Sequence, residues 1–406
     1  MTADAFAFDY APGKLVSGPG CVGDLGDELD SRGLDRAMVM CGSTVGSTAA
    51  VMEPVRAGLA DHLVDVFDRT SAKKYLGTAA EAAALVEAAD IDAIVAVGGG
   101  SALDTAKATA ALTSHDGPPE AVAEEMIAAG NVTAAAEGDP VPVIAVPTTL
   151  AGADLSVIAG TNLTLDPGDM PDHEIPSGSV VGPGLMPTAL FYDADLFAAT
   201  PSGLLTASAM NGFDKALEAL YSRHATPVTD GTATRAIRLF SEHAAVLNED
   251  DPDRKRLTDA VNGIVLAQYG VSTPGTYKLS VIHAFGHGFS HDYEAHQGTV
   301  HAIVAPHVLR YLFHRVDGRR HLLAEAFGID TDGFTDEEVA GAVIDQVVAV
   351  RDALELPAEL RRIDGLDRDH LPSIAQTIAD DGLMSGRPEG LEMDVDDIED
   401  VLRTAW

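Results

Sequence analysis

The first half of the chain alternates short apolar runs with longer segments of helical spacing. Apolar runs that favour buried strands occupy residues 36–41, 91–97, 142–146 and 189–193. Alanine-rich segments with helical spacing precede and follow the second run. Because strand–helix–strand alternation is typical of parallel sheets, we expect an α/β domain with a parallel sheet and helices on both faces.

The second half has helical periodicity throughout. The predicted helices cover residues 202–222, 229–247, 253–269, 278–290, 301–313, 337–354 and 371–380. We therefore expect two domains, an α/β domain over residues 1–195 and an all-α domain over residues 196–406. A segment rich in proline and glycine, residues 166–184, predicts a long loop or a hairpin insertion.

The composition limits the class of protein. The 406 residues are 46% hydrophobic, which is enough for a sizeable core. No apolar run reaches the ~18 residues of a membrane span, and the first residues lack the pattern of a signal peptide. We expect a cytoplasmic protein. The two cysteines, Cys21 and Cys41, exclude a disulfide framework.

The chain is strongly acidic, with 26 Lys+Arg against 63 Asp+Glu and a formal net charge of −37. The acidic residues are spread along the whole chain, a haloarchaeal-type composition that favours a protein from a salt-accumulating organism. Such a surface repels phosphate backbones, so we expect no nucleic-acid partner. Lysines are few: Lys14, Lys73, Lys74, Lys107, Lys215, Lys255 and Lys278.

A glycine-rich motif, GGGSALDTAK, follows the second predicted strand. Gly98, Gly99 and Gly100 would let the backbone approach a phosphate, and the start of the next helix attracts anions. We expect Ser101 to cap this helix, with Asp104 three residues later as in a capping box. The alternative is an ordinary strand-to-helix turn, since the motif is not the G-x-G-x-x-G fingerprint.

Two threonines follow the third predicted strand. Thr148 and Thr149 would lie at the carboxyl edge of the sheet, where open α/β sheets bind ligands. They could contact a phosphate or a ribose of a nucleotide, or serve only as turn and cap residues.

Histidines gather near residue 290: His283, His287, His291, His296 and His301. The first three are spaced i, i+4, i+8 and would share one helical face. Histidine is the usual metal ligand and proton carrier near neutral pH, which favours a functional site over core packing.

Together these motifs resemble the iron-containing (group III) alcohol dehydrogenase family. The resemblance rests on GGGSALDTAK, PTTLAGAD and HAFGHGF…HQGTVHAIVAPHVLRY in this order, supported by YAPGKLVSGPG, SAMNGFDKALEALYS and GRPEGL. It implies a dehydroquinate synthase-like two-lobed fold with the active site in the cleft between the lobes. It also implies NAD(P)-linked interconversion of a small alcohol with an aldehyde or ketone, in a homo-oligomer.

The sequence departs from this family at the metal site. The family holds its Fe or Zn with one Asp and three His, and the resemblance aligns Asn211 and Lys215 with the Asp and the first His. His283 matches the second His, and the last falls at His296 or Gln297. A metal on His283 and His296 would lack half of its ligands, so a bound divalent metal is doubtful.

Two further observations bear on that site. An alternative register would use Asp214 and Glu218 as the i, i+4 pair, but it misaligns the rest of the helix. Asparagine at the position of Asn211 also resembles the maleylacetate reductase branch of the family, whose members are regarded as not needing the metal.

This departure suggests how the reaction would run. Hydride transfer to a carbonyl builds negative charge on oxygen, and a fixed ammonium can stabilise that charge in place of a metal. We expect Lys215 to do so beside Asn211, with His283 or His287 supplying or relaying the proton. Alternatively, Lys215 is a surface residue at the edge of the cleft.

The cofactor would be NAD or NADP. An Asp that favours NAD often follows the second strand in the family, and here that position is Gly42, followed by Ser43. Loss of the carboxylate removes repulsion against a 2′-phosphate, so we expect NADP to be tolerated.

Two other functions stay open from sequence. One is a lyase or cyclase similar to dehydroquinate synthase, which shares the two-lobed design. The other is a non-catalytic protein that has lost its metal ligands and only binds nucleotide.

Overall fold

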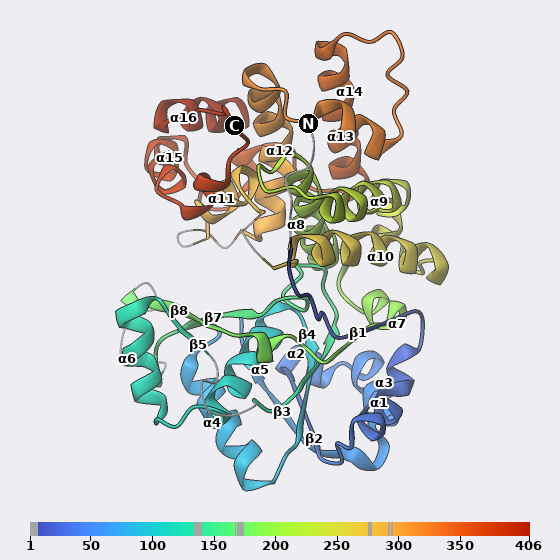
Figure 1. Ribbon diagram of the computed structural model, residues 1–406, viewed down its shortest axis with the longest axis vertical. Coiled ribbons are helices and arrows are strands. Elements are labelled where there is room, and N and C mark those ends of the chain that lie inside the picture. Colours follow the sequence, from blue (N-terminus) through green and yellow to red (C-terminus); the bar gives the residue numbers. More distant parts are fainter. Residues whose placement is uncertain are drawn as a thin grey trace. The chain divides into compact units, whose positions relative to one another are not determined.

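The computed structural model describes residues 7–133, 140–166, 168, 174–274, 278–290, 293 and 295–406. Its contacts divide the chain into two compact units, an α/β unit of residues 11–200 and a helical unit of residues 201–406 together with residues 7–10 (Figure 1). Tyr10 belongs to the helical unit because its hydroxyl donates to the carbonyl oxygen of Tyr269 at 3.0 Å. The functional division expected between residues 195 and 196 stays a prediction.

The α/β unit is built on a six-stranded sheet in the order β1-β9-β6-β4-β2-β3, with every pair parallel. The strands are β1 (Lys14–Ser17), β2 (Ala37–Gly42), β3 (Leu63–Thr70), β4 (Ala93–Gly98), β6 (Val143–Pro147) and β9 (Ala189–Tyr192). The predicted parallel sheet is therefore confirmed. The central strands β2, β4 and β6 are buried almost throughout, as their continuous apolar runs indicate.

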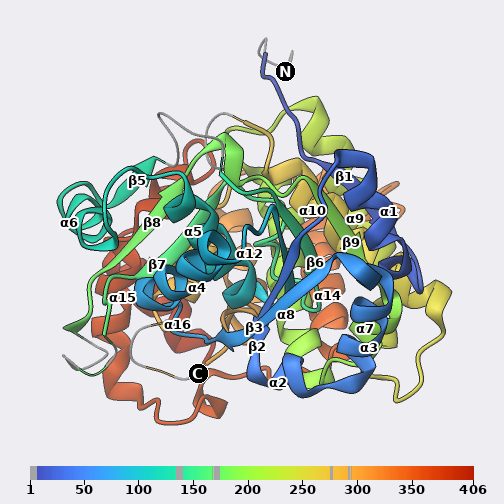
Figure 2. The same ribbon diagram turned by 90° about the horizontal axis from the view of Figure 1, so that it is seen from below.

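Helices cover both faces of this sheet. Helices α1 and α3 lie on one side, and α4 and α5 lie on the other (Figures 1 and 2). Alternate side chains of each central strand pack against α1 and α3, as Val39, Val95 and Ile144 do. The helices are α1 (Leu25–Arg32), α2 (Ser43–Ser47), α3 (Ala49–Leu59), α4 (Leu76–Ala88), α5 (Gly100–Thr113), α6 (Pro119–Ala129) and α7 (Ala194–Ala198).

A second, three-stranded sheet has the order β5-β8-β7. Strands β7 (Ile158–Asn162) and β8 (Ser177–Val181) pair antiparallel, and β5 (Asn131–Thr133) adds parallel to β8. The segment 166–184 thus contains one arm of a hairpin, one of the two forms expected for it. Residues 167 and 169–173 of that segment lie outside the described residues.

The described part of the helical unit contains helices α8 to α16 and short 3-10 turns. Helix α8 contacts α9, α10, α11 and α12, and its residues from Leu205 to Tyr221 are buried. The helices are α8 (Ser202–Tyr221), α9 (Pro227–His243), α10 (Arg254–Val271), α11 (Val281–His287), α12 (Gln297–Arg315), α13 (Arg320–Phe327), α14 (Asp336–Ala353), α15 (Leu371–Ala379) and α16 (Val395–Thr404). Among the described residues, no helix is long and apolar enough to cross a membrane.

The helix predicted over residues 278–290 is shorter than expected. Helix α11 ends at His287, so the face expected to carry three histidines holds only His283 and His287. His291 lies outside the described residues. Glycines flank His287 in HAFGHGF. Glycine has a low helical propensity, so the helix ends earlier than the histidine spacing predicted.

Candidate functional site

In the α/β unit, the predicted nucleotide-binding residues lie at the carboxyl ends of three adjacent strands. Gly42 ends β2 and Ser43 begins α2, while the glycine motif follows β4 and the threonine pair follows β6. A Cβ on Gly42 would lie 3.2 Å from the carbonyl oxygen of Thr70, so a larger residue would crowd β3.

The glycine motif and the threonine pair contact each other directly. The backbone N–H of Thr148 donates to the carbonyl oxygen of Gly98 at 2.9 Å. Gly98 has φ = +139°, which L side chains rarely adopt, and a Cβ on Gly99 would lie 3.1 Å from Oγ1 of Thr149. The two segments thus form a closely packed pair of loops at one edge of the sheet.

The expectation that Ser101 caps the next helix is wrong. Helix α5 already begins at Gly100, and its N-cap residue, Gly99, makes no side-chain hydrogen bond to the helix. Asp104 does not complete a capping box either, because its carboxylate pairs with the ammonium of Lys74 at 3.0 Å. A 14-residue helix whose N-cap is a glycine leaves its first N–H groups to another acceptor, as phosphate-binding loops do.

The last residue of the glycine motif is a buried lysine that sequence analysis did not assign. Lys107 has no exposed surface, and its ammonium donates to the carbonyl oxygens of Ala153 at 2.6 Å and Ser156 at 2.5 Å. Burial lowers the pKa of Lys107 to about 8, although nearby Asp104 and Asp154 oppose the shift. Lys107 thereby ties helix α5 to the loop that follows Thr149.

In the helical unit, the residues at the family's metal positions hydrogen-bond to amides. Asn211 and Lys215 lie one turn apart on α8, and both are buried. The side-chain N–H of Asn211 donates to Oε1 of Gln297 at 3.3 Å, and the ammonium of Lys215 donates to Oε1 of Gln268 at 2.6 Å. It is therefore Gln297 that reaches Asn211, whereas Nδ1 of His296 accepts from the N–H of Gly298 at the start of α12.

This arrangement does not fit a divalent metal. An ammonium and two amides offer no anionic ligand and only weak oxygen donors, so His283 is the one strong ligand among the four positions. Within the described residues, the only three metal-type side chains whose ligand atoms lie within 4.8 Å of one another are Asp30, Asp35 and His62.

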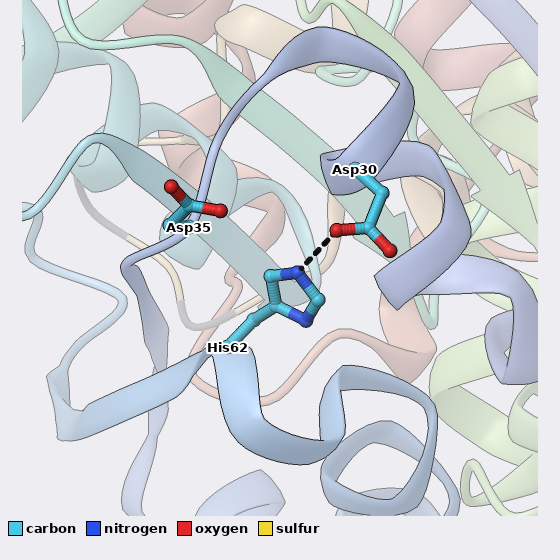
Figure 3. A group of neighbouring side chains, drawn as sticks. All are labelled: Asp30, Asp35 and His62. Atoms are coloured by element: carbon cyan, nitrogen blue, oxygen red, sulfur yellow. Dashed lines mark hydrogen bonds and ion pairs between the residues drawn. The ribbon is translucent and has the colours of Figure 1, made fainter.

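That trio is in the α/β unit and is largely exposed (Figure 3). Both ring nitrogens of His62 already face oxygens: Nε2 lies 3.0 Å from Oδ1 of Asp30, and Nδ1 lies 3.1 Å from the carbonyl oxygen of Leu59. Hydrogen bonds therefore account for the position of this ring without an ion.

A buried carboxylate on α8 orients His283. Glu218 accepts from the N–H groups of Ser280 and Ile282 at 2.9 and 2.7 Å, from the hydroxyl of Tyr221 at 2.9 Å and from Nδ1 of His283 at 2.7 Å. Burial alone would raise the pKa of Glu218, but these donors hold it below its usual range. The pair fixes the ring and caps the first turn of α11.

The ring of His283 is neutral and presents an unshared lone pair. Burial lowers the pKa of His283 to about 4, so the ring is neutral near pH 7. With Nδ1 donating to Glu218, the lone pair is on Nε2, which is buried and has no hydrogen-bond partner among the described residues. Lys215 is close enough for its charge to contribute, after burial, to this lowered pKa.

Two more buried polar residues lie in this cluster: Asp214, from the alternative register, and His301, from the group of five histidines. Nδ1 of His301 is 3.3 Å from Oδ2 of Asp214, and the rings of His283 and His301 are 4.6 Å apart. Gly286 makes room for His301, because a Cβ there would lie 2.2 Å from its Nε2. Burial raises the pKa of Asp214 well above its usual range, and neither of its oxygens has a hydrogen-bond partner among the described residues.

His287 lies apart from these buried residues. Its side chain is 42% exposed, and its Nδ1 lies 2.8 Å from Oδ2 of Asp381. The sequence spacing that placed His283 and His287 on one helical face was correct, but their partners differ.

Comparisons with known proteins cover nearly the whole chain. Residues 12–191 match the family model "Iron-containing alcohol dehydrogenase", and residues 205–406 match "Fe-containing alcohol dehydrogenase family, C-terminal". The chain is 27% identical to lactaldehyde reductase of Escherichia coli strain K12, over 96% of this chain and 97% of that one. It is also 27% identical to maleylacetate reductase of Sphingobium indicum, over 75% of each chain.

Solved structures share the fold. The alcohol dehydrogenase from Oenococcus oeni superposes with a TM-score of 0.84 at 22% identity, covering 98% of this chain and 100% of that one. A structure of 1,3-propanediol oxidoreductase superposes with a TM-score of 0.86 at 21% identity, covering 99% of this chain and 100% of that one. With both halves matched, the chain belongs to the iron-containing alcohol dehydrogenase family and is an oxidoreductase rather than a lyase or a non-catalytic nucleotide-binding protein.

Proposed function

We propose that the protein transfers hydride between NAD and a small alcohol or carbonyl compound without a metal ion, and that the ammonium of Lys215 replaces the metal. The observation that carries this proposal is the set of hydrogen bonds that Asn211, Lys215 and Gln297 make to amides. These three residues stand at positions where the family has metal ligands, and each is already engaged in a hydrogen bond.

The choice of NAD is supported by a relative, the "NAD-dependent methanol dehydrogenase" of Bacillus methanolicus, which is 25% identical over 98% of this chain. The phosphates of NAD would be held by two loops, which contain Gly98, Gly99, Gly100, Thr148 and Thr149. The uncapped start of α5 supplies N–H donors for them. Tolerance of NADP, expected from Gly42 and Ser43, stays a prediction.

In the direction of reduction, a bound nicotinamide would supply hydride to the carbonyl carbon, and negative charge would develop on the carbonyl oxygen. The ammonium of Lys215 stabilises the negative charge that develops there. The oxygen then takes a proton, which Lys215 supplies directly or His283 relays.

In the direction of oxidation, the alcohol loses a proton and its carbon gives hydride to the cofactor. His283 suits a proton relay, because Nε2 carries the lone pair and Nδ1 donates to Glu218, while a pKa near 4 keeps the ring from retaining the proton. Asn211 would orient the substrate oxygen beside Lys215.

Relatives guide the choice of substrate. Their names refer to lactaldehyde, maleylacetate and methanol, all small oxygenated compounds. We therefore assign the protein small alcohols, aldehydes and ketones, including acidic ones.

The acidic composition supports a setting of high salt. The proposal also includes a cytoplasmic location, assembly into a homo-oligomer and no nucleic-acid partner, as expected from the sequence.

Replacement of Lys215 tests the mechanism. Lys215→Met should lower kcat by about 10²- to 10³-fold, the usual cost of removing one donor to a developing oxyanion, while the Kd for NADH changes little. Lys255→Met, at an exposed lysine that pairs with Asp259, is the control for loss of one positive charge. Turnover of Lys215→Met equal to that of the control would remove Lys215 from the mechanism.

The same preparations test metal independence. Dialysis against EDTA should leave kcat unchanged, and added Fe²⁺ or Zn²⁺ should not raise it. A stoichiometric transition metal detected by elemental analysis in the active enzyme, together with loss of activity on its removal, would contradict the proposal.

A further inference from the structure

Gln268 holds the ammonium of Lys215 from a second helix. The side chain comes from α10, which packs against α8, and it is 6% exposed. Its Oε1 accepts from Nζ of Lys215 at 2.6 Å, and its Nε2 donates to Oγ of Ser272 at 2.8 Å.

These two contacts fix the orientation of the amide. An ammonium can only donate hydrogen bonds, so the oxygen of Gln268 has to face Lys215. The nitrogen then faces Ser272 one turn later on the same helix, where the hydroxyl accepts. A flipped amide would direct its N–H groups at the ammonium and lose the bond to Lys215.

The chemical nature of the acceptor matters as much as its place. A neutral amide oxygen holds the ammonium without offsetting its charge. A carboxylate at the same distance would form a buried ion pair and offset most of that charge.

We propose that Gln268 is a positioning residue that places the charge of Lys215 for the reacting oxygen without neutralising it. This inference rests on the proposed function of Lys215. It assigns to α10 a part in the reaction that no motif of the sequence indicated.

Two substitutions separate the position of the charge from its strength. Gln268→Glu keeps the size of the side chain and adds a carboxylate, and we expect kcat to fall about 10- to 100-fold with little change in the Kd for NADH. Gln268→Met keeps the bulk but removes the acceptor, and we expect a smaller fall in kcat. Gln376→Glu, at an exposed amide on α15 that contacts Asp380, is the matched control.

A double-mutant cycle with Lys215→Met gives the decisive measurement. If Gln268 acts through Lys215, Gln268→Glu should cause no further loss of kcat in the Lys215→Met background. An equal loss in both backgrounds, or unchanged kcat in the single variant, would overturn the inference. Thermal unfolding of each variant identifies losses that come only from misfolding.

The cycle also keeps the two hypotheses apart. If Lys215→Met retains full turnover, the proposed function fails. If Lys215→Met is inactive and Gln268→Glu is fully active, only the role of Gln268 fails.

Discussion

The ammonium of Lys107 has no exposed surface, and it donates hydrogen bonds to the backbone carbonyl oxygens of Ala153 and Ser156. Burial makes the charged form costly, and the two carbonyl oxygens recover part of that cost. The lysine therefore holds the loop after Thr149 against α5 at some expense to stability.

The cost of burying the charged lysine should make the free energy of unfolding depend on pH. The pKa of Lys107 is about 8 in the folded protein against 10.5 for an ordinary lysine. Between these values the unfolded chain binds a proton that the folded chain does not, so this group makes the folded state more stable as the pH rises from about 8 to 10.5. The slope is at most about 1.4 kcal/mol per pH unit.

Urea denaturation of the wild type and of Lys107→Met from pH 7 to 10.5 measures this contribution. The difference in the free energy of unfolding should grow with pH in favour of the wild type. A difference that is independent of pH would mean that Lys107 titrates normally.

For single residues, the sequence predicted some members of the site but not their hydrogen-bond partners. Lys215 and Asn211 stood out because they depart from a family pattern on one helix. Gln268 did not, because its contact with Lys215 spans 53 positions and depends on how α10 packs against α8. Spacing along one helix can be read from sequence, but the registry between two helices cannot.

Among the elements, α11 shows how one helix sets the start of another. Its N-cap residue, Ser280, makes no side-chain capping bond, and the carboxylate of Glu218 on α8 takes the N–H groups of Ser280 and Ile282 instead. The start of α11 and the ring of His283 are therefore positioned by the same carboxylate.

Glu218→Gln should destabilise the protein by about 2–4 kcal/mol, because in either orientation the amide nitrogen would face the backbone N–H of Ser280 or Ile282, which can only donate. Glu338→Gln is the comparison, since Glu338 caps α14 at an exposed site and its loss should matter far less. Denaturant midpoints measure both effects. Equal shifts in the two variants would mean that the buried cap adds nothing.

The elements themselves were largely predictable. The buried strands β2, β4, β6 and β9 and most long helices lie where periodicity placed them. Strand β3 was missed because it is an edge strand, and its polar, partly exposed residues give no continuous apolar run. Helix α11 was overestimated because glycines follow its histidines.

For the whole molecule, the net charge of −37 is the dominant electrostatic feature. Many acidic side chains, such as Asp251 and Asp30, are highly exposed, so their mutual repulsion acts mainly through solvent. Salt shortens the range of that repulsion, from about 8 Å at 0.15 M to about 3 Å at 1 M.

The melting temperature should therefore rise as KCl increases from 0.1 to ~1 M, with a smaller slope above that concentration, where screening is nearly complete. Replacing exposed aspartates by asparagine should flatten the rise, because it removes the repulsion that salt screens. Calorimetry across this series tests the expectation. A melting temperature that falls or stays constant with added salt would contradict it.

The hydrogen bond between Asn211 and Gln297 also constrains how this lineage can evolve. Regaining the ligands that the family uses would require new side chains at Asn211, Lys215 and Gln297. Each substitution alone gives up an existing hydrogen bond before the set can hold an ion, so no single substitution would restore a metal site. Under the proposed metal-free mechanism, the three positions are therefore expected to change together or not at all.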